Sequence, residues 1–392
     1  MANAEEILKR TLTEIANKQD LKNHQLYVQE ISSEGANHSS VIFNAKILCP
    51  DKPDLKLFAK VASMAESLRT QMDVDHFYAK EVYVYQELVK IYNDIQEKYN
   101  VPVDDRFVFP KFYGSNETRL EETVVLENLA EDRYTMFDRF KSVNWDFASK
   151  SIEELAKFHA LSFAYKNEYP DMFPTNDSSF NISNNMPFKD FSIFDNMLQM
   201  LYVHVDDNLK ERLQKFVATN FTMDVALKYY GPSKWPVLVH GDYRASNIMF
   251  KRQGGKVKSL IPVDYQAVRL ASPSTDILYF IYTGTDKEFR RVHLKHLLDH
   301  YYNTLSKFLK MFNMDPEVTF SRKDFDEEYK EMLPYGLFTT MFLLPMVLVD
   351  SANAPKMDAG GADMTNFVIK PNESFKKRFL PTIEEFVKLG VL

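Results

Sequence analysis

The spacing of hydrophobic residues changes along the chain, and each change predicts a different kind of element. Apolar residues three or four positions apart over residues 5–16 predict an amphipathic opening helix. Residues 25–31, 40–48 and 55–61 are rich in Val, Ile, Phe and Leu, and they predict three strands. Helical spacing returns over residues 73–92. The first part of the chain is therefore predicted to combine a small sheet with one main helix.

Two further strands, at residues 107–113 and 123–127, complete a predicted five-stranded sheet. Mainly helical spacing follows, and a Gly-Gly turn within it predicts one hairpin. We therefore predict an α+β fold. A small antiparallel N-terminal lobe would span residues 1–127, a hinge residues 128–134, and a large mainly helical C-terminal lobe residues 135–392.

Composition is consistent with two lobes and limits the possible partners. A chain of 392 residues is too long for one ordinary core, and 45% hydrophobic with 26% charged residues is typical of globular proteins. The formal charge of −7, with no basic run, argues against broad nucleic-acid binding. A nucleotide would need a local cationic site instead.

The cysteine content and the most apolar stretch bear on location. Cys49 is the single cysteine, which excludes an internal disulfide and favours a reducing compartment. Residues 333–349 are the most hydrophobic stretch, but Pro334, Gly336 and Pro345 interrupt it and it is too short to span a bilayer. We expect a cytoplasmic protein.

One motif points to chemistry. In His240-Gly241-Asp242, the acid lies five positions before Asn247, and Asp264 follows an apolar run. In kinase-type phosphoryl transfer, an Asp at this spacing accepts the proton of the acceptor hydroxyl and the Asn holds magnesium. The later Asp holds the metal against the nucleotide phosphates. The predicted hairpin would bring Asn247 and Asp264 together at its open end.

A possible ion pair upstream fits the same chemistry. Lys60 closes the third predicted strand, and Glu81 lies near the apolar side of the helix that follows, where an unpaired carboxylate would be costly. A strand Lys paired with a helix Glu positions phosphates in kinases. The alternative is a solvated strand end and a surface glutamate.

These residues carry a resemblance. They include the small-residue turn at 35–40, residues 57–60 and 77–81, the hinge stretch 125–129, the helix stretch 155–160, the motifs around Asp242 and Asp264, and residues 272–278. In these positions the chain resembles the ecdysteroid kinase-like family, within the aminoglycoside phosphotransferase and choline kinase group. The resemblance implies a bilobal protein-kinase-like fold.

The resemblance also implies roles for individual residues. Asp242 would be the catalytic base, Asn247 and Asp264 the Mg²⁺ ligands, and Lys60 the ATP phosphate anchor with Glu81 as its partner. The remaining nucleotide contacts would come from the turn and the hinge, at Asn37, Ser39, Ser40, Glu127 and Leu129.

Three other positions complete the sequence-based account. Arg244 stands where the family often has Trp, so it is the candidate substrate-binding residue that sets this chain apart. Asp276 suits a capping or loop-holding role better than catalysis. His159 is better explained as a packing histidine than as a catalytic one.

Other classes of function stay open. A protein kinase is disfavoured because the chain has no Gly-x-Gly-x-x-Gly, Asp-Phe-Gly or Ala-Pro-Glu motif. A metal-dependent phosphohydrolase would leave Lys60 and Glu81 without a role, and a catalytically silent steroid- or nucleotide-binding protein would not need all the metal acids. The expected protein is a monomeric small-molecule kinase that binds ATP, Mg²⁺ and a small hydroxylated apolar substrate. An ecdysteroid is the leading acceptor, and a hydroxylated or glycosylated xenobiotic is the alternative.

Overall fold

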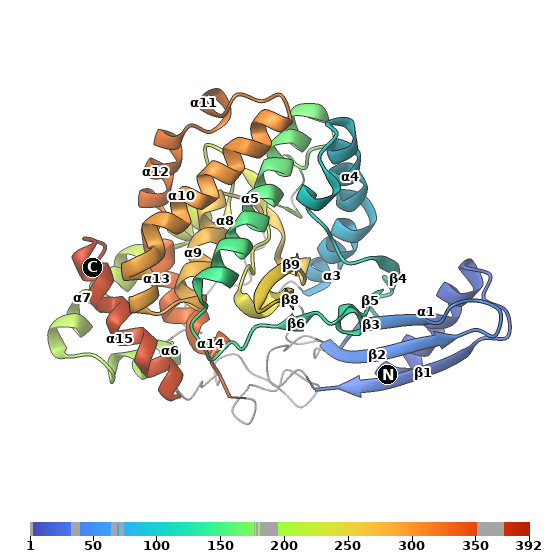
Figure 1. Cartoon of the computed structure of the whole chain (residues 1–392). Helices are drawn as coiled ribbons and strands as arrows, with labels where there is room; N and C mark the ends of the chain where they lie inside the picture. The colour runs from blue at the N-terminus through green and yellow to red at the C-terminus, as the bar shows by residue number, and fades with distance from the viewer. Residues whose placement is uncertain are drawn as a thin grey trace.

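The fold has a small sheet on one side and a large group of helices on the other (Figure 1). The computed structural model describes residues 3–32, 40–63, 69, 74–175, 177, 179–180, 195–350 and 372–392. The first third of the chain contains five strands and two long helical segments, and helices dominate the rest. This arrangement confirms the predicted α+β class.

The sheet is antiparallel, with the order β1-β2-β3-β5-β4. Its strands are β1 (Gln25–Ile31), β2 (Ser40–Leu48), β3 (Leu55–Ala62), β4 (Phe112–Asn116) and β5 (Thr123–Glu127). Helix α1 (Ala4–Lys18) packs its apolar side against one face of the sheet. On β3, Leu57, Ala59 and Val61 belong to that cluster, so Lys60 points to the opposite face because side chains alternate along a strand.

A long helix covers the opposite face of the sheet, and it continues beyond the helical stretch predicted over residues 73–92. Helix α3 (Val74–Tyr83) continues through a π-helical turn (Val84–Leu88) into α4 (Val89–Lys98). Tyr85, in the π-helical turn, packs edge-on against Tyr265 with ring centroids 5.7 Å apart. This contact joins the helix to the segment that follows Asp264.

The predicted strand at residues 107–113 is wrong in its position. The strand β4 begins only at Phe112. The side chain of Gln96 holds Phe107 on both backbone groups, accepting from its N–H at 2.6 Å and donating to its carbonyl at 3.2 Å. These bonds replace ladder bonds, and Pro110 could donate none.

The larger part of the molecule is built around α5 (Trp145–Glu168) and α10 (Lys287–Met311), which pack along each other (Figure 1). The other helices with eight or more residues are α6 (Asp195–Tyr202), α7 (Asp207–Asn220), α8 (Met223–Tyr230), α9 (Pro273–Gly284), α12 (Arg322–Glu331) and α15 (Glu373–Lys388). Short strands β6 (Thr135–Met136), β7 (Val237–Val239), β8 (Ile248–Gln253), β9 (Lys256–Pro262) and β10 (Arg269–Ala271) lie among them. Within the described ranges, no helix is long and apolar enough to cross a membrane.

The hydrophobic stretch at residues 333–349 and the residues before it form several short helices rather than one long helix. They form α12, then α13 (Leu333–Phe338), a π-helical turn (Thr339–Leu343) and α14 (Leu344–Val347). Pro334 and Pro345 each lie at the start of a short helix, where the missing N–H costs nothing.

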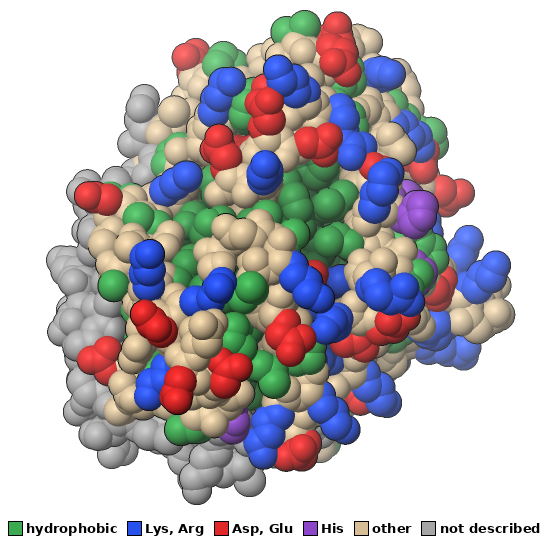
Figure 2. All heavy atoms as spheres, turned by 90° about the vertical axis from the view of Figure 1, so that its left-hand side faces the viewer, with side chains coloured by type: hydrophobic (Ala, Val, Ile, Leu, Met, Phe, Trp, Pro, Cys, Tyr) green, Lys and Arg blue, Asp and Glu red, His purple; other side chains and the backbone are tan. Residues whose placement is uncertain are grey.

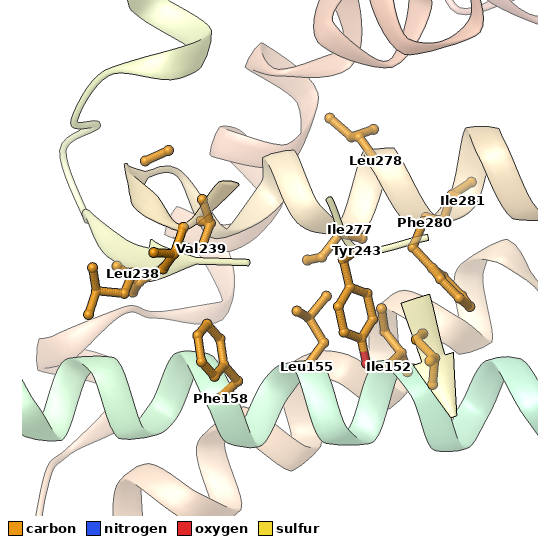
Figure 3. Packing of buried hydrophobic residues seen from close by; sticks show 14 of the residues in the cluster. Ile152, Leu155, Phe158, Leu238, Val239, Tyr243, Ile277, Leu278, Phe280 and Ile281 are labelled. Carbon is orange, nitrogen blue, oxygen red and sulfur yellow. The ribbon is translucent and has the colours of Figure 1, made fainter. Parts of the chain in front are cut away.

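Figure 3 shows how the helices hold the segment that carries the candidate chemistry. Side chains of α5, among them Leu155 and Phe158, face Leu238 of β7 and Ile277 of α9 across one apolar layer. Tyr243 lies within this layer, and its hydroxyl donates to the Ser151 carbonyl at 2.6 Å. The chain around Asp242 is thereby fixed to the core on both sides.

The buried carboxyl group of Glu328 on α12 allows a test of how the helical part of the molecule is packed. Burial raises its pKa to about 7, although the hydroxyls of Ser233 and Ser272 partly offset the effect. Because the folded-state pKa lies above the unfolded value of 4.5, the stabilisation from the bound proton is complete below about pH 4.5 and is lost as the pH rises through 7. Glu328→Gln should therefore gain up to about 3 kcal/mol in unfolding free energy, relative to the native chain, between acidic and mildly alkaline pH. Urea unfolding at both pH values measures this gain. Glu327 is exposed on the same helix. Glu327→Gln is therefore the control and should show no such change.

Candidate active site

Lys60 lies at the centre of the candidate site. Its Nζ atom is 2.9 Å from Oε1 of Glu81 and 2.6 Å from Oδ1 of Asp264. The Glu81 side chain is fully buried, and those of Lys60 and Asp264 are mostly buried. The predicted Lys60–Glu81 pair is therefore present in the structure, and Asp264 lies on the same ammonium group.

The three charges change one another's proton affinity. Burial opposes the charged form of Lys60, but the carboxylates of Asp264 and Glu81 outweigh it and raise the lysine pKa above its usual value. Burial would raise the pKa of Asp264, yet Lys60 lowers it below its usual range. Burial raises the pKa of Glu81, against the effect of Lys60. The ammonium stays charged, and Asp264 stays an anion.

Asp242 and Asn247 form the second part of the site. The side-chain amide of Asn247 donates to Oδ2 of Asp242 at 2.8 Å and to its backbone carbonyl at 3.0 Å. Nε of Arg244 lies 3.4 Å from the same Oδ2. Burial would lower the pKa of Arg244, but the charge of Asp242 more than offsets this and raises it. Arg244 is thus placed against the proposed base, and its contact with a substrate stays a prediction.

The loop that carries Asp242 is held by Asp276. The backbone N–H groups of His240 and Gly241 donate to Oδ2 and Oδ1 of Asp276 at 2.6 and 2.8 Å. His159 lies 3.2 Å from Oδ2 of Asp276 through Nε2 and 2.8 Å from the Tyr301 hydroxyl through Nδ1. The geometry agrees with the loop-holding role predicted for Asp276 and with a buried packing role for His159.

The β8–β9 hairpin brings Asn247 next to the segment that leads to Asp264. The N–H of Val263 donates to the carbonyl of Asn247 at 2.9 Å, and β8 and β9 pair from there towards the turn. Asp264 itself has φ of +71°, a left-handed conformation that is unusual for a residue with a side chain. Tyr265 then packs against His240 with ring centroids 4.7 Å apart. These contacts fix the direction in which Asp264 leaves the hairpin.

The predicted nucleotide contacts are placed in part. The hydroxyl of Ser40 lies 2.7 Å from that of Tyr78, on the helix that carries Glu81. Asn37 and Ser39 lie outside the described residues. The carbonyl of Leu129 accepts from the N–H of Tyr134 at 3.1 Å, which leaves the Leu129 N–H as the group that could face a purine. The backbone N–H of Lys111 donates to Oε1 of Glu127 at 2.8 Å.

Sequence reasoning missed two side chains next to the loop. The Tyr279 hydroxyl donates to Oδ1 of Asp242 at 2.6 Å. The sequence could have indicated Tyr279, because a residue three positions after Asp276 lies on the same face of a helix. Arg269 of β10 is buried against Gly241, and its NH1 donates to the Ala267 carbonyl at 3.4 Å. Nothing in the local sequence predicts that contact, since it depends on the path of the chain after Asp264.

Two side chains of the site carry oxygen atoms that could hold a magnesium ion, Asn247 and Asp264. Mg²⁺ takes oxygen ligands and commonly shares them with substrate phosphates. The Asn247 amide nitrogen faces Asp242, so its side-chain oxygen is available, and Lys60 engages one of the two oxygens of Asp264. Over the described residues, no cluster of three or more His, Cys, Asp or Glu side chains could hold a metal alone. The residues therefore fit a cation that arrives with a nucleotide.

Comparison with known proteins finds one family that matches most of the chain, one partial relative and several distantly similar structures. Residues 34–314 match the model of the ecdysteroid kinase-like family. An uncharacterized kinase-like protein of Caenorhabditis elegans is 32% identical over 108 residues, which are 28% of this chain and 27% of that protein. The chain thus spans about a quarter of the length of this relative.

The solved structures that match this chain do so at low identity and low TM-score. The GDP and kanamycin complex of the phosphotransferase APH(2'')-IIIa is 13% identical, with a TM-score of 0.42 over 84% of this chain and 98% of that one. A macrolide 2'-phosphotransferase from Brachybacterium faecium is 13% identical, with a TM-score of 0.36 over 84% and 91%. A microcompartment-associated aminopropanol kinase is 10% identical, with a TM-score of 0.40 over 97% and 98%. These likenesses are too distant to assign residues or a substrate.

The loop geometry predicts a severe effect of one methyl group. Gly241 has φ of +82°, and an added Cβ would lie 2.1 Å from the Ala267 carbonyl oxygen. Gly241→Ala should displace the loop and lower the melting temperature by several degrees, the effect of about 1–3 kcal/mol in a chain of this size. Gly255→Ala is the matched control, because φ there is +81° and no atom lies near the added group. Equal melting temperatures for the two variants would show that the contact with Ala267 does not constrain the loop.

Proposed function

Because the chain belongs to the ecdysteroid kinase-like family, we propose that it transfers the γ-phosphoryl group of ATP to a hydroxyl group of a small molecule. The observation that carries the proposal is that two groups of contacts lie at the open end of one hairpin. Lys60 contacts Glu81 and Asp264, which follows the hairpin. Asn247, which precedes the hairpin, contacts Asp242. A strand Lys paired with a helix Glu, and an Asp with an Asn five positions later, are parts that phosphoryl transfer uses together.

The nucleotide would bind against Lys60. Its ammonium group is held by Glu81 at 2.9 Å, so it is oriented before any phosphate arrives. Asn247 and Asp264 would hold Mg²⁺, which when bound neutralises charge on the phosphate oxygens. Ser40 at the start of β2 and the N–H of Leu129 would contact the phosphates and the base, with Asn37, Ser39 and Glu127 as further proposed contacts.

Asp242 would act on the acceptor. The acceptor hydroxyl gives its proton to the carboxylate of Asp242 as its oxygen bonds to the γ-phosphorus. The bond from that phosphorus to the bridging oxygen breaks, and ADP leaves with the electron pair. A strong base is unnecessary because the transition state is mostly loose, so the orientation supplied by Asn247 matters more than basicity.

An apolar acceptor is supported by the aromatic side chains next to the loop. Arg269, which touches Gly241, lies over the ring of Tyr230 at 4.8 Å. Tyr230 contacts Tyr335 at a centroid distance of 5.8 Å, and Tyr335 stacks on Phe338 at 5.9 Å. Tyr335 is itself buried, whereas Tyr230 and Phe338 are partly exposed. Partly exposed aromatic rings suit acceptors whose ring systems carry few charges.

Hydrophobic side chains also reach the outside on the helical half of the molecule. Figure 2 shows them gathered in a hollow on the face that forms the left-hand side of Figure 1, with charged side chains around it. An ecdysteroid is the acceptor we propose, since it combines an apolar ring system with several hydroxyl groups. A hydroxylated or glycosylated xenobiotic is the second candidate, which the placement of the Arg244 cation beside Asp242 favours, because a cation there suits a more polar acceptor.

A cytoplasmic location and a monomeric state belong to the same proposal. Cys49 is the single cysteine of the chain and is buried. A thiol that forms no internal disulfide suits a reducing compartment, where ATP is also available.

The function is tested by measuring ADP release from the full chain with Mg–ATP, with and without ecdysone. Release that rises with ecdysone supports the proposed kinase, and mass spectrometry should find ecdysone with one added phosphoryl group. Release that ecdysone does not change, with free phosphate as product, identifies a phosphohydrolase. Thermal stabilisation by ecdysone with no ADP identifies a binding protein.

Asp242→Asn is the sharpest variant in that assay. The amide keeps the shape of the carboxylate but cannot accept the hydroxyl proton, so we expect turnover to fall by about two to four orders of magnitude. ATP affinity, measured by calorimetry, should stay near that of the native chain, because Lys60 and Asp264 are unchanged. Near-native turnover in a preparation free of contaminating kinases contradicts the assignment.

A further inference from the structure

The two oxygens of the Asp242 carboxylate lie in different surroundings. Oδ2 accepts the Asn247 amide at 2.8 Å, and Nε of Arg244 lies 3.4 Å from it. Oδ1 accepts the hydroxyl of Tyr279 at 2.6 Å. An ionised carboxylate offers about four lone-pair positions, two on each oxygen. The Asn247 amide is bonded to Oδ2 and the Arg244 cation lies beside that oxygen, whereas a single hydroxyl lies at Oδ1. Oδ1 is therefore the less crowded oxygen, and it keeps an open lone-pair position.

Tyr279 is well placed to control that open position. It lies on α9, three residues after Asp276, which holds the backbone of the same loop. Its side chain is 7% exposed, so the hydroxyl has little freedom to turn towards water. Burial and the nearby Asp242 carboxylate raise its pKa well above the usual value, so the hydroxyl keeps the proton that it donates.

We propose that Tyr279 is a positioning residue that fixes the Asp242 carboxylate and directs the acceptor hydroxyl to Oδ1. This inference rests on the proposed kinase function and extends it to the geometry of the acceptor. The acceptor oxygen then lies beside the Tyr279 hydroxyl, on the side of the carboxylate away from Arg244.

The arrangement persists through proton transfer. The acceptor O–H bond breaks, its proton binds the open position of Oδ1, and the acceptor oxygen bonds to the γ-phosphorus as ADP leaves. Oδ1 then carries one proton and keeps one lone pair, which still accepts from Tyr279. No side chain has to turn during the step, which is what a preorganised site requires.

Tyr279→Phe tests the proposal in the full chain. It removes only the hydroxyl, so we expect kcat with ecdysone and Mg–ATP to fall about 10- to 100-fold, the effect of one hydrogen bond to a charged group. The KM for ATP and the calorimetric affinity for ATP should not change, because Tyr279 does not contact Lys60 or Asp264 in any described interaction.

Tyr282→Phe is the matched control. Tyr282 is buried on the same helix, and its hydroxyl has no hydrogen-bond partner among the described residues. It should keep the native kcat. A native kcat for Tyr279→Phe, or an equal loss in both variants, overturns the positioning role.

Failure of the proposed function can be distinguished from failure of this inference. If native ADP release does not rise with ecdysone, the proposed acceptor is wrong, and the rate without acceptor becomes the readout. Water then gives its proton to the same oxygen, so a 10- to 100-fold loss in Tyr279→Phe alone supports the role, and no loss overturns it. A native chain that releases no ADP under either condition overturns both.

Discussion

The ammonium group of Lys60 joins parts of the molecule that are far apart in sequence. It contacts Glu81, 21 positions away on a helix, and Asp264, 204 positions away after the hairpin. The lysine is placed by strand alternation, the glutamate by the helix that covers the sheet, and the aspartate by the β8–β9 pairing. Each of these elements must be in register for the three charged groups to meet.

Burial makes this contact a strong constraint. Removing ions from water costs several kcal/mol each unless they are paired, and two carboxylates close together would repel. Without Lys60, the fully buried Glu81 and the mostly buried Asp264 would lack their cation. Before any nucleotide binds, the site thus holds two acidic side chains and one ammonium group. A metal ion and nucleotide phosphates would bring the further positive and negative charges to this cluster.

Much of this arrangement was predictable from local sequence, and the rest was not. Strands β1, β2 and β5 end where the apolar pattern predicted. In β2 every second residue from Phe43 to Ile47 is buried, and β5 is buried over most of its length. The Lys60–Glu81 pair followed from the cost of an unpaired buried acid. The strand at residues 107–113 was misplaced, since a single side chain, Gln96, takes the backbone groups that a ladder would use.

Some contacts of the loop around Asp242 could not be predicted from the local sequence. Asp276 was identified as a loop-holding residue, but the pairing of its two oxygens with successive N–H groups needed the three-dimensional path. Tyr279 was missed because an aromatic residue in an apolar helix is typical of a core position. Arg244 was noticed only as a departure from its relatives, and its proximity to Asp242 gives that departure a physical meaning.

We propose that the Lys60 contact with Asp264 marks the nucleotide site. A crystal structure of the full chain with Mg²⁺ and a non-hydrolysable ATP analogue tests it most directly. We expect Nζ of Lys60 to leave Asp264 for phosphate oxygens while it keeps Glu81, and the metal to bind Asn247 and Asp264. A nucleotide bound elsewhere, with Lys60 still on Asp264, would contradict the account.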